Sequence, residues 1–394
     1  MKLFDGVSAT IWRMGLSQAL MMTVMNVNLT NTALVGSLLA PSPWLITLPL
    51  SIQFIAVMIA TIPASLLMAK FGRRPVFLAG VIVVSIGAFG QALSILTGSF
   101  IPLVFSSFLV GLGQGVAQFY RYAAADTAEG ADKAKAVSFV LLGGLVSAII
   151  GPEIAFRTVD LVPNSLYAGC FIVTGLVQML AIPVIWGLKL PPIQRLKTQG
   201  RHISKFLVMP SFLSGLIAAA LGYGLMTFLM TATPLQIVDV SKLSHEANAR
   251  VIQWHVFAMF APSLFSGILI AKFGVGKILW VGLACYVLSS ITALSGNEFY
   301  TYLIALILLG IGWNFLYVGG SSIIANCTNP EERGRVQGIA DFCIFSMVAT
   351  ASMLSGMIHN QLGWVFMMTI AFVPIFLIAV SLILGRPKLI SEPT

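Results

Sequence analysis

The sequence contains twelve long apolar runs, and this pattern constrains the fold more than any other feature. A helix that crosses a bilayer needs about 20 mainly apolar residues. We place such runs at residues 12–36, 45–69, 75–95, 100–124, 135–158, 165–188, 206–233, 248–271, 277–295, 299–325, 335–358 and 362–385. The longest polar stretch between them, 189–205, is too short to fold alone. We therefore predict an all-α membrane protein with twelve transmembrane helices.

The charged residues are few and follow the pattern of membrane topology. The chain is 58% hydrophobic and 9% charged, with a formal net charge of +9. If the N-terminus is cytoplasmic, 18 of the 22 Lys and Arg residues fall at cytoplasmic ends and loops. Because cytoplasmic loops carry an excess of Lys and Arg, we predict that both termini are cytoplasmic. The basic residues are spread along the topology rather than clustered on one soluble face, so we expect no nucleic-acid partner.

Catalytic motifs are missing from the sequence. The four cysteines, Cys170, Cys285, Cys327 and Cys343, have no paired spacing and indicate neither a disulfide framework nor a zinc site. No nucleophile and base occur at a recognisable spacing, and no Gly-Lys motif for binding phosphate is present. We predict that the protein is not an enzyme and has no cofactor.

An internal repeat divides the chain near residue 200. The segment from Met68 to Arg74 (MAKFGRR) recurs from Ile270 to Gly276 (IAKFGVG), and the pair Gly111 and Gly113 recurs as Gly310 and Gly312. We predict two six-helix halves, 1–188 and 206–394, joined by a basic cytoplasmic linker, 189–205. Parallel halves of this kind are typical of transporters, where they surround a central substrate site.

Two pairs of side chains in the second half have the chemistry of a copper site. Met226 and Met230, like His255 and Met259, are four residues apart and so share a helix face. At about 1.5 Å per residue, all four lie within roughly 20 Å of the outer loop between the two helices. Thioethers select Cu(I), and imidazole also binds copper. We predict that Met226, Met230, His255 and Met259 bind a copper ion.

The alternative to a copper site is ordinary packing. Met side chains fill irregular gaps in apolar cores, and Met21 with Met25 shows the same spacing of four residues. His255 favours the metal hypothesis, because ionisable groups within apolar runs are costly and usually functional. By the repeat, Met25 corresponds to Met230 and is a possible additional ligand, although packing also explains it.

Three charged residues within or next to the apolar runs are candidates for coupling or gating. Glu153 is the deepest carboxylate of the chain. It is either a proton-coupling site or a partner of Arg157, one turn further on. Arg121 should face a cavity or a partner, because an intramembrane Arg is expensive. Asp126 is the nearest candidate for that partner.

Aromatic and amide residues also occur in the apolar runs. Trp313, Asn314 and Tyr317 stand together in the run 299–325, where they either stack on a flat organic substrate or fill a helix interface. The run 12–36 carries asparagines but no acidic residue. An exporter of organic cations would be expected to have one there.

These features together resemble the major facilitator superfamily over the whole chain. The segment Lys70-Phe71-Gly72-Arg73-Arg74 is similar to the family's basic loop between the second and third helices, although Ala69 stands where the family has Asp. The resemblance implies the major facilitator fold and secondary transport by alternating access. The resemblance also implies that the protein is a monomer.

The two ligand pairs extend the resemblance to a narrower branch of this superfamily. Met226-x-x-x-Met230 and His255-x-x-x-Met259 look like the copper-binding motifs of the CcoA-like importers of the bacterial inner membrane. That resemblance implies copper import. The same motifs do not separate copper import from riboflavin uptake, which is assigned to other members of the branch. We therefore expect a Cu(I) importer serving cytochrome oxidase assembly, with a riboflavin uptake transporter as the alternative and proton-coupled efflux of drugs or organic cations as a second alternative.

Overall fold

A computed structural model describes residues 8–128, 132–190 and 204–385, and every regular element in these ranges is a helix. The first part of the chain forms α1 (Ala9–Leu39), η1 (Pro43–Leu45), α2 (Leu48–Phe71), α3 (Arg73–Leu96), α4 (Phe100–Ala117), α5 (Tyr120–Asp126), α6 (Asp132–Arg157), α7 (Ala168–Met179) and α8 (Ala181–Trp186). The second part forms α9 (Ser204–Leu207), α10 (Pro210–Pro234), the π-helix η2 (Leu235–Val240), α11 (His245–Phe260), α12 (Ser263–Phe273), α13 (Val275–Leu294), α14 (Phe299–Asn326), α15 (Pro330–Ile370) and α16 (Phe372–Gly385). The prediction of an all-α protein is confirmed.

Each predicted apolar run coincides with a helix or a pair of helices, but not every one qualifies as a membrane span by length and composition. Nine helical stretches of the described residues do, or ten if the bent pair α11 and α12 counts as one span. One difference from the twelve predicted spans is α1, which is not among these stretches. Another is the stretch Val336–Gly385, which counts once although Gly363, with φ 77°, interrupts its helical backbone.

The repeated segments adopt the same backbone conformation. Gly72 follows the last residue of α2 and Gly274 follows the last residue of α12, and both glycines have φ 84°. The N–H of Gly72 donates to the carbonyl of Met68, and the N–H of Gly274 donates to that of Ile270. Because L side chains rarely adopt this backbone conformation, glycine is needed at both positions, and the repeat is present in the structure as well as in the sequence.

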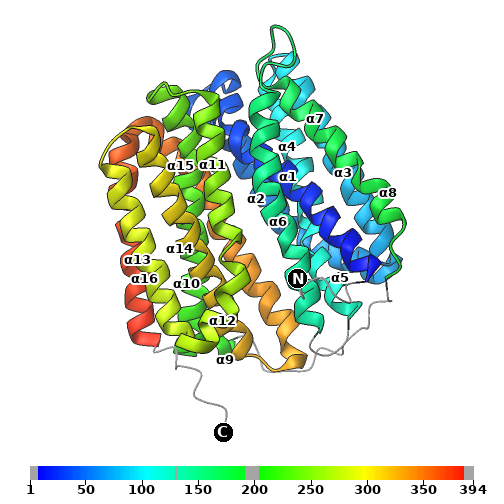
Figure 1. The fold of residues 1–394 in the computed structure, drawn as a ribbon, viewed down its shortest axis with the longest axis vertical. Coiled ribbons are helices and arrows are strands. Elements are labelled where there is room, and N and C mark those ends of the chain that lie inside the picture. Colours follow the sequence, from blue (N-terminus) through cyan, green and yellow to red (C-terminus); the bar gives the residue numbers. More distant parts are fainter. Residues whose placement is uncertain (1–7, 129–131, 191–203, 386–394) are drawn as a thin grey trace. The chain divides into compact units, whose positions relative to one another are not determined.

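The described residues fall into two compact units. The first comprises the described part of Met1–Arg195 together with Asn248–Gln253, and the second comprises the described part of Leu196–Ala247 together with Trp254–Thr394. In the first unit α1 packs along α6, and α4 packs against α2 and α3. In the second unit α10 packs against α14, α15 and α16, and α13 packs along α14 (Figure 1). Most of the predicted linker 189–205 lies outside the described residues.

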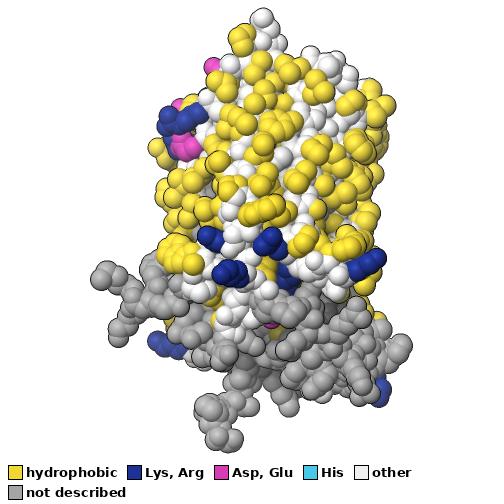
Figure 2. Space-filling model, turned by 90° about the vertical axis from the view of Figure 1, so that its right-hand side faces the viewer, with side chains coloured by type: hydrophobic (Ala, Val, Ile, Leu, Met, Phe, Trp, Pro, Cys, Tyr) yellow, Lys and Arg dark blue, Asp and Glu magenta, His cyan; other side chains and the backbone are white. Residues whose placement is uncertain are grey.

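The outer surface is apolar. On the face shown in Figure 2, hydrophobic side chains cover much of the described surface; most Lys and Arg side chains lie toward its lower part, and one further basic group lies beside acidic side chains at the upper left. Exposed hydrophobic residues in the first unit include Ile82, Ile86, Phe105 and Leu176. Surfaces as apolar as this are rare on soluble proteins and suit contact with lipid.

Candidate functional site

His255 is the most informative residue of the second unit. Its side chain is fully buried, and its Nδ1 lies 2.7 Å from the carbonyl oxygen of Leu306 on α14. A carbonyl oxygen only accepts hydrogen bonds, so Nδ1 carries the proton and donates it to that contact. The other ring nitrogen, Nε2, has no hydrogen-bond partner among the described residues. His255 therefore presents a buried, unpaired nitrogen that can accept a hydrogen bond or bind a metal ion.

The three predicted thioether ligands are buried in the same unit. Met226 and Met230 lie on α10 and Met259 lies on α11, with exposed fractions of 4% or less. No group of three His, Cys, Asp or Glu side chains suited to a metal ion occurs within the described ranges. A metal bound to His255 would therefore depend on thioethers. The possible additional ligand Met25 is half-buried on α1, in the first unit.

Asn314 stabilises a break in the helical segment that carries His255. α11 ends at Phe260 and α12 begins at Ser263, with a bend of 42° between them. The Nδ2 group of Asn314 donates to the carbonyl oxygen of Met259 at 2.7 Å and to the hydroxyl of Ser263 at 2.5 Å. This replaces helical hydrogen bonding interrupted near Pro262. The side chain of Asn314 therefore stabilises the backbone at the break between α11 and α12.

An aromatic cluster surrounds Trp313 on α14. Its indole stacks on the ring of Tyr317, with the centroids 5.2 Å apart and the planes within 10°. Tyr223 on α10 lies edge-on to both rings, at 5.2 Å from Trp313 and 5.4 Å from Tyr317. Trp313 is 6% exposed, and its Nε1 has no hydrogen-bond partner in the described part of the chain. This cluster brings flat apolar surfaces and one unpaired donor into the interior of the second unit.

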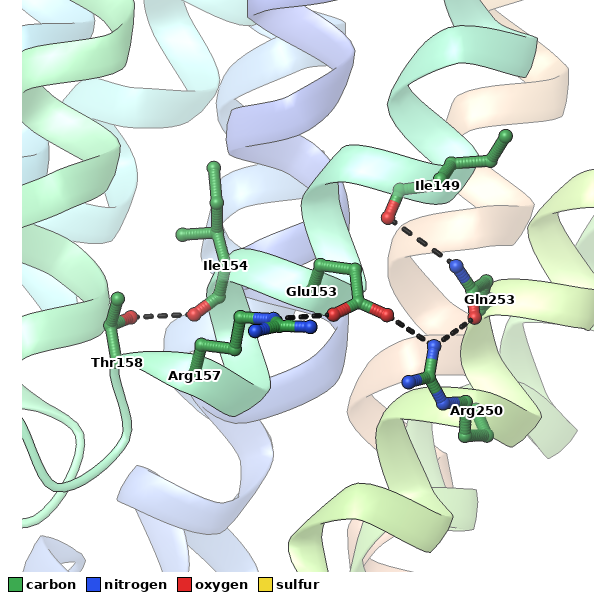
Figure 3. A network of polar contacts seen from close by, with 7 residues as sticks. All are labelled: Ile149, Glu153, Ile154, Arg157, Thr158, Arg250 and Gln253. Carbon is green, nitrogen blue, oxygen red and sulfur yellow. Dashed lines mark hydrogen bonds and ion pairs between the residues drawn. The ribbon is translucent and has the colours of Figure 1, made fainter.

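Glu153 is the centre of an ionic network in the first unit (Figure 3). Its Oε2 accepts a hydrogen bond from Nε of Arg157 at 2.8 Å, and its Oε1 accepts one from Arg250 at the start of α11. Arg250 also donates to the side-chain oxygen of Gln253 at 3.0 Å, and Gln253 donates to the carbonyl of Ile149. The predicted pairing of Glu153 with Arg157 is present, and Arg250 is a second partner that sequence analysis missed.

Asp126 has a partner that the sequence did not predict. Its carboxylate forms an ion pair with Arg73, which begins α3. Arg121 donates to the hydroxyl of Tyr122 at 3.1 Å, and its guanidinium lies over that ring. The expectation of Asp126 as the partner of Arg121 overlooked Arg73, which lies 53 residues away along the chain.

The asparagines of α1 connect it to other helices of the first unit. Asn26 donates to the hydroxyl of Ser147 on α6 at 3.1 Å. Asn28 accepts a hydrogen bond from Gln91 on α3 at 2.8 Å. Both side chains are buried. Their amides therefore contribute to packing within the unit, because buried polar groups need partners.

Comparison with known proteins identifies the class of this chain. The model of the Major Facilitator Superfamily matches residues 14–261 and 244–394. The chain therefore belongs to this superfamily, and it is a multi-span membrane transporter.

Two relatives and two solved structures add detail. The chain is 38% identical to the riboflavin transporter RfnT of Brucella anthropi, over 90% of each chain. It is 28% identical to the uncharacterized MFS-type transporter YddS of Bacillus subtilis, over 73% of this chain and 70% of that protein. A bacterial homologue of the human lysosomal transporter Spinster has the same fold, with a TM-score of 0.75, 14% identity and 98% coverage of both chains. The nucleoside transporter NupG also shares it, with a TM-score of 0.72, 13% identity and coverage of 96% of this chain and 99% of that one.

Proposed function

We propose that this protein is a secondary transporter that takes up riboflavin. The observation that carries the proposal is the 38% identity to a riboflavin transporter across 90% of both chains. The aromatic cluster of Tyr223, Trp313 and Tyr317 supports it, because flat ring systems bind well to aromatic side chains. Riboflavin was the alternative in the sequence analysis, and the relative favours it over copper as the main function.

Uptake measurements test this proposal directly. A riboflavin-auxotrophic bacterial strain without its own flavin importer would express the chain and receive labelled riboflavin. We expect labelled riboflavin to accumulate above the empty-vector level, unlabelled riboflavin to compete, and a copper chelator to have no effect. Accumulation equal to that of the empty vector, with the protein present in the membrane, would contradict the proposal.

Copper import is the second candidate, and His255 is the observation that favours it. A histidine that ligates a metal usually donates its other ring N–H to a carbonyl or carboxylate. His255 has this arrangement, with Nδ1 donating to Leu306 and Nε2 unpaired. Neutral imidazole and thioethers would leave a bound Cu(I) with its single positive charge, and thioether ligands suit that ion.

The copper hypothesis has its own test. Cells without other copper importers would express the wild-type chain, His255→Ala or Met259→Ala, and receive labelled copper. If copper is the cargo, both variants should lose copper accumulation while still inserting into the membrane. Met353→Ala is the matched control, because this methionine is 53% exposed. Copper uptake that is equal in all four strains would exclude the His255 site.

A further inference from the structure

The repeat relates His255 to a glutamine in the first unit. Gln53 lies 15 residues before Met68, and His255 lies 15 residues before Ile270. Met68 and Ile270 begin the repeated segments and occupy equivalent places at the ends of α2 and α12. Gln53 and His255 are therefore equivalent positions of the two repeats.

The repeat relates Trp313 to a second glutamine. Gln114 lies three residues after Gly111 on α4, and Trp313 lies three residues after Gly310 on α14. Gly111 and Gly310 are the first glycines of the repeated Gly-x-Gly motif. Gln114 and Trp313 are therefore the equivalent residues on these two helices.

Helix packing confirms this register. A Cβ atom on Gly111 would meet the carbonyl oxygen of Gln53, and one on Gly310 would lie 2.6 Å from the carbonyl oxygen of His255. In each unit, two equivalent helices therefore approach closely, α2 and α4 in the first and α11 and α14 in the second, because glycine has no side chain at the contact. The side chains at these positions can be compared directly.

The two units differ in the hydrogen-bond partners of the side chains at these positions. In the first unit Nε2 of Gln53 donates to Oε1 of Gln114 at 2.9 Å. In the second unit, neither Nε2 of His255 nor Nε1 of Trp313 has a hydrogen-bond partner among the described residues. Nε2 of His255 can accept a hydrogen bond, and the indole N–H of Trp313 can donate one. The second unit therefore holds an acceptor and a donor where the first unit has a closed hydrogen bond.

Four further hydroxyl groups of the same unit have no hydrogen-bond partner among its described residues, and two of them share a face of α10 with Tyr223. Tyr223, Thr227 and Thr231 are four residues apart on α10 and so lie on one face of it. The hydroxyls of Thr227 and Thr231 are buried and lack a hydrogen-bond partner in the described ranges. Because buried polar groups normally find partners, unpaired groups on α10, α11 and α14 together indicate a site for a polar ligand.

We propose that His255 and Trp313 recognise the imide edge of a flat heteroaromatic ligand. The indole N–H of Trp313 donates to a ring carbonyl, and Nε2 of His255 accepts the adjacent ring N–H. The aromatic cluster stacks against the flat ring system. This inference rests on the proposed function, because the pyrimidinedione ring of riboflavin carries such an edge, with an N3–H between two carbonyls.

Methylation of the ligand at N3 tests the role of His255. Purified protein in detergent would bind riboflavin or 3-methylriboflavin, with affinity measured by quenching of flavin fluorescence. We expect wild-type protein to bind riboflavin about tenfold more tightly than 3-methylriboflavin, since one hydrogen bond is lost. In His255→Leu this ratio should fall to about one, because the acceptor is gone from the protein. A tenfold ratio retained in His255→Leu would overturn the inference.

Trp313→Phe tests the donor and has matched controls. This variant should weaken the binding of both flavins by the same factor, because Trp313 is assigned to a carbonyl rather than to N3. Trp254→Phe and Trp280→Phe should bind like wild type, since these residues are 48% and 44% exposed. Unchanged flavin affinity in Trp313→Phe would remove Trp313 from the site.

A measurement on wild-type protein covers the case in which His255→Leu fails to fold. The chain has four histidines, so ¹⁵N-histidine labelling produces a simple NMR spectrum. Riboflavin should shift the Nε2 resonance of His255 as that nitrogen gains a hydrogen bond, and 3-methylriboflavin should not. Equal shifts with both flavins would overturn the inference. Absence of any riboflavin binding would instead overturn the proposed function together with this inference.

Discussion

The two units use the same backbone contact for different purposes. In the first unit the contact between α2 and α4 is closed by the hydrogen bond from Gln53 to Gln114, and α1 is connected to its neighbours through buried asparagines. In the second unit the equivalent positions carry His255 and Trp313, whose side-chain nitrogens are unpaired. The comparison indicates that the first unit joins these two positions by a hydrogen bond, although Oε1 of Gln53 itself has no partner among the described residues, whereas the second unit leaves Nε2 of His255 and Nε1 of Trp313 for a ligand.

The largest expected effect concerns the helix contact that both units share. Gly111→Ala and Gly310→Ala should each lower the free energy of unfolding by about 1–3 kcal/mol, because the added Cβ meets the backbone of the facing helix. Unfolding in mixed detergent micelles measures this. We expect the larger loss for Gly111→Ala, where the carbonyl of Gln53 lies closer.

Gly267→Ala is the control for this experiment. Gly267 lies on α12, and a Cβ there would meet nothing within 4 Å. Alanine is the better helix former, so this variant should be as stable as wild type or slightly more stable. A similar loss for all three variants would mean that close packing at the repeated glycines is not the cause.

The intermediate effect distinguishes the hydrogen-bonded side chains of the first unit from the unpaired side chains at the equivalent positions of the second unit. We expect Gln53→Leu and Gln114→Leu to show a coupling free energy of about 1 kcal/mol in a double-mutant cycle of stability, because the two side chains share a hydrogen bond. In the absence of ligand, His255→Leu and Trp313→Phe should be additive within about 0.5 kcal/mol. Coupling of equal size in both units would show that His255 and Trp313 contact each other directly.

The smallest expected effect concerns the charges of the first unit. Glu153→Gln should lower the free energy of unfolding by about 0.5 kcal/mol, because two arginines lose their counter-charge while Arg157, with a side chain that is 72% exposed, is partly screened by solvent. We expect the pH dependence of riboflavin uptake to stay as in wild type, since the carboxylate already has two cationic partners. Asp160→Asn, at an exposed position, is the control. Loss of the pH dependence in Glu153→Gln alone would instead identify Glu153 as the coupling site.

His255 and Trp313 are candidates from the sequence itself, and their equivalence to two glutamines of the first unit is also present in the sequence. The repeat register between Met68 and Ile270 already relates Gln53 to His255, and extending it to Gln114 and Trp313 requires only counting. Tyr223 carried no such signal, since a single tyrosine in an apolar run resembles any packed aromatic residue.

The sequence alone determined the helical class of the chain, its apolar runs and the repeat that contains Gly72 and Gly274. These features depend on local composition and spacing, which are properties of neighbouring residues. Only the tertiary structure decided which buried polar groups are satisfied: Leu306 for one nitrogen of His255, Arg250 for Glu153 and Arg73 for Asp126. A hydrogen-bond partner depends on the rotation and depth of another helix, and packing between segments far apart in the chain sets both.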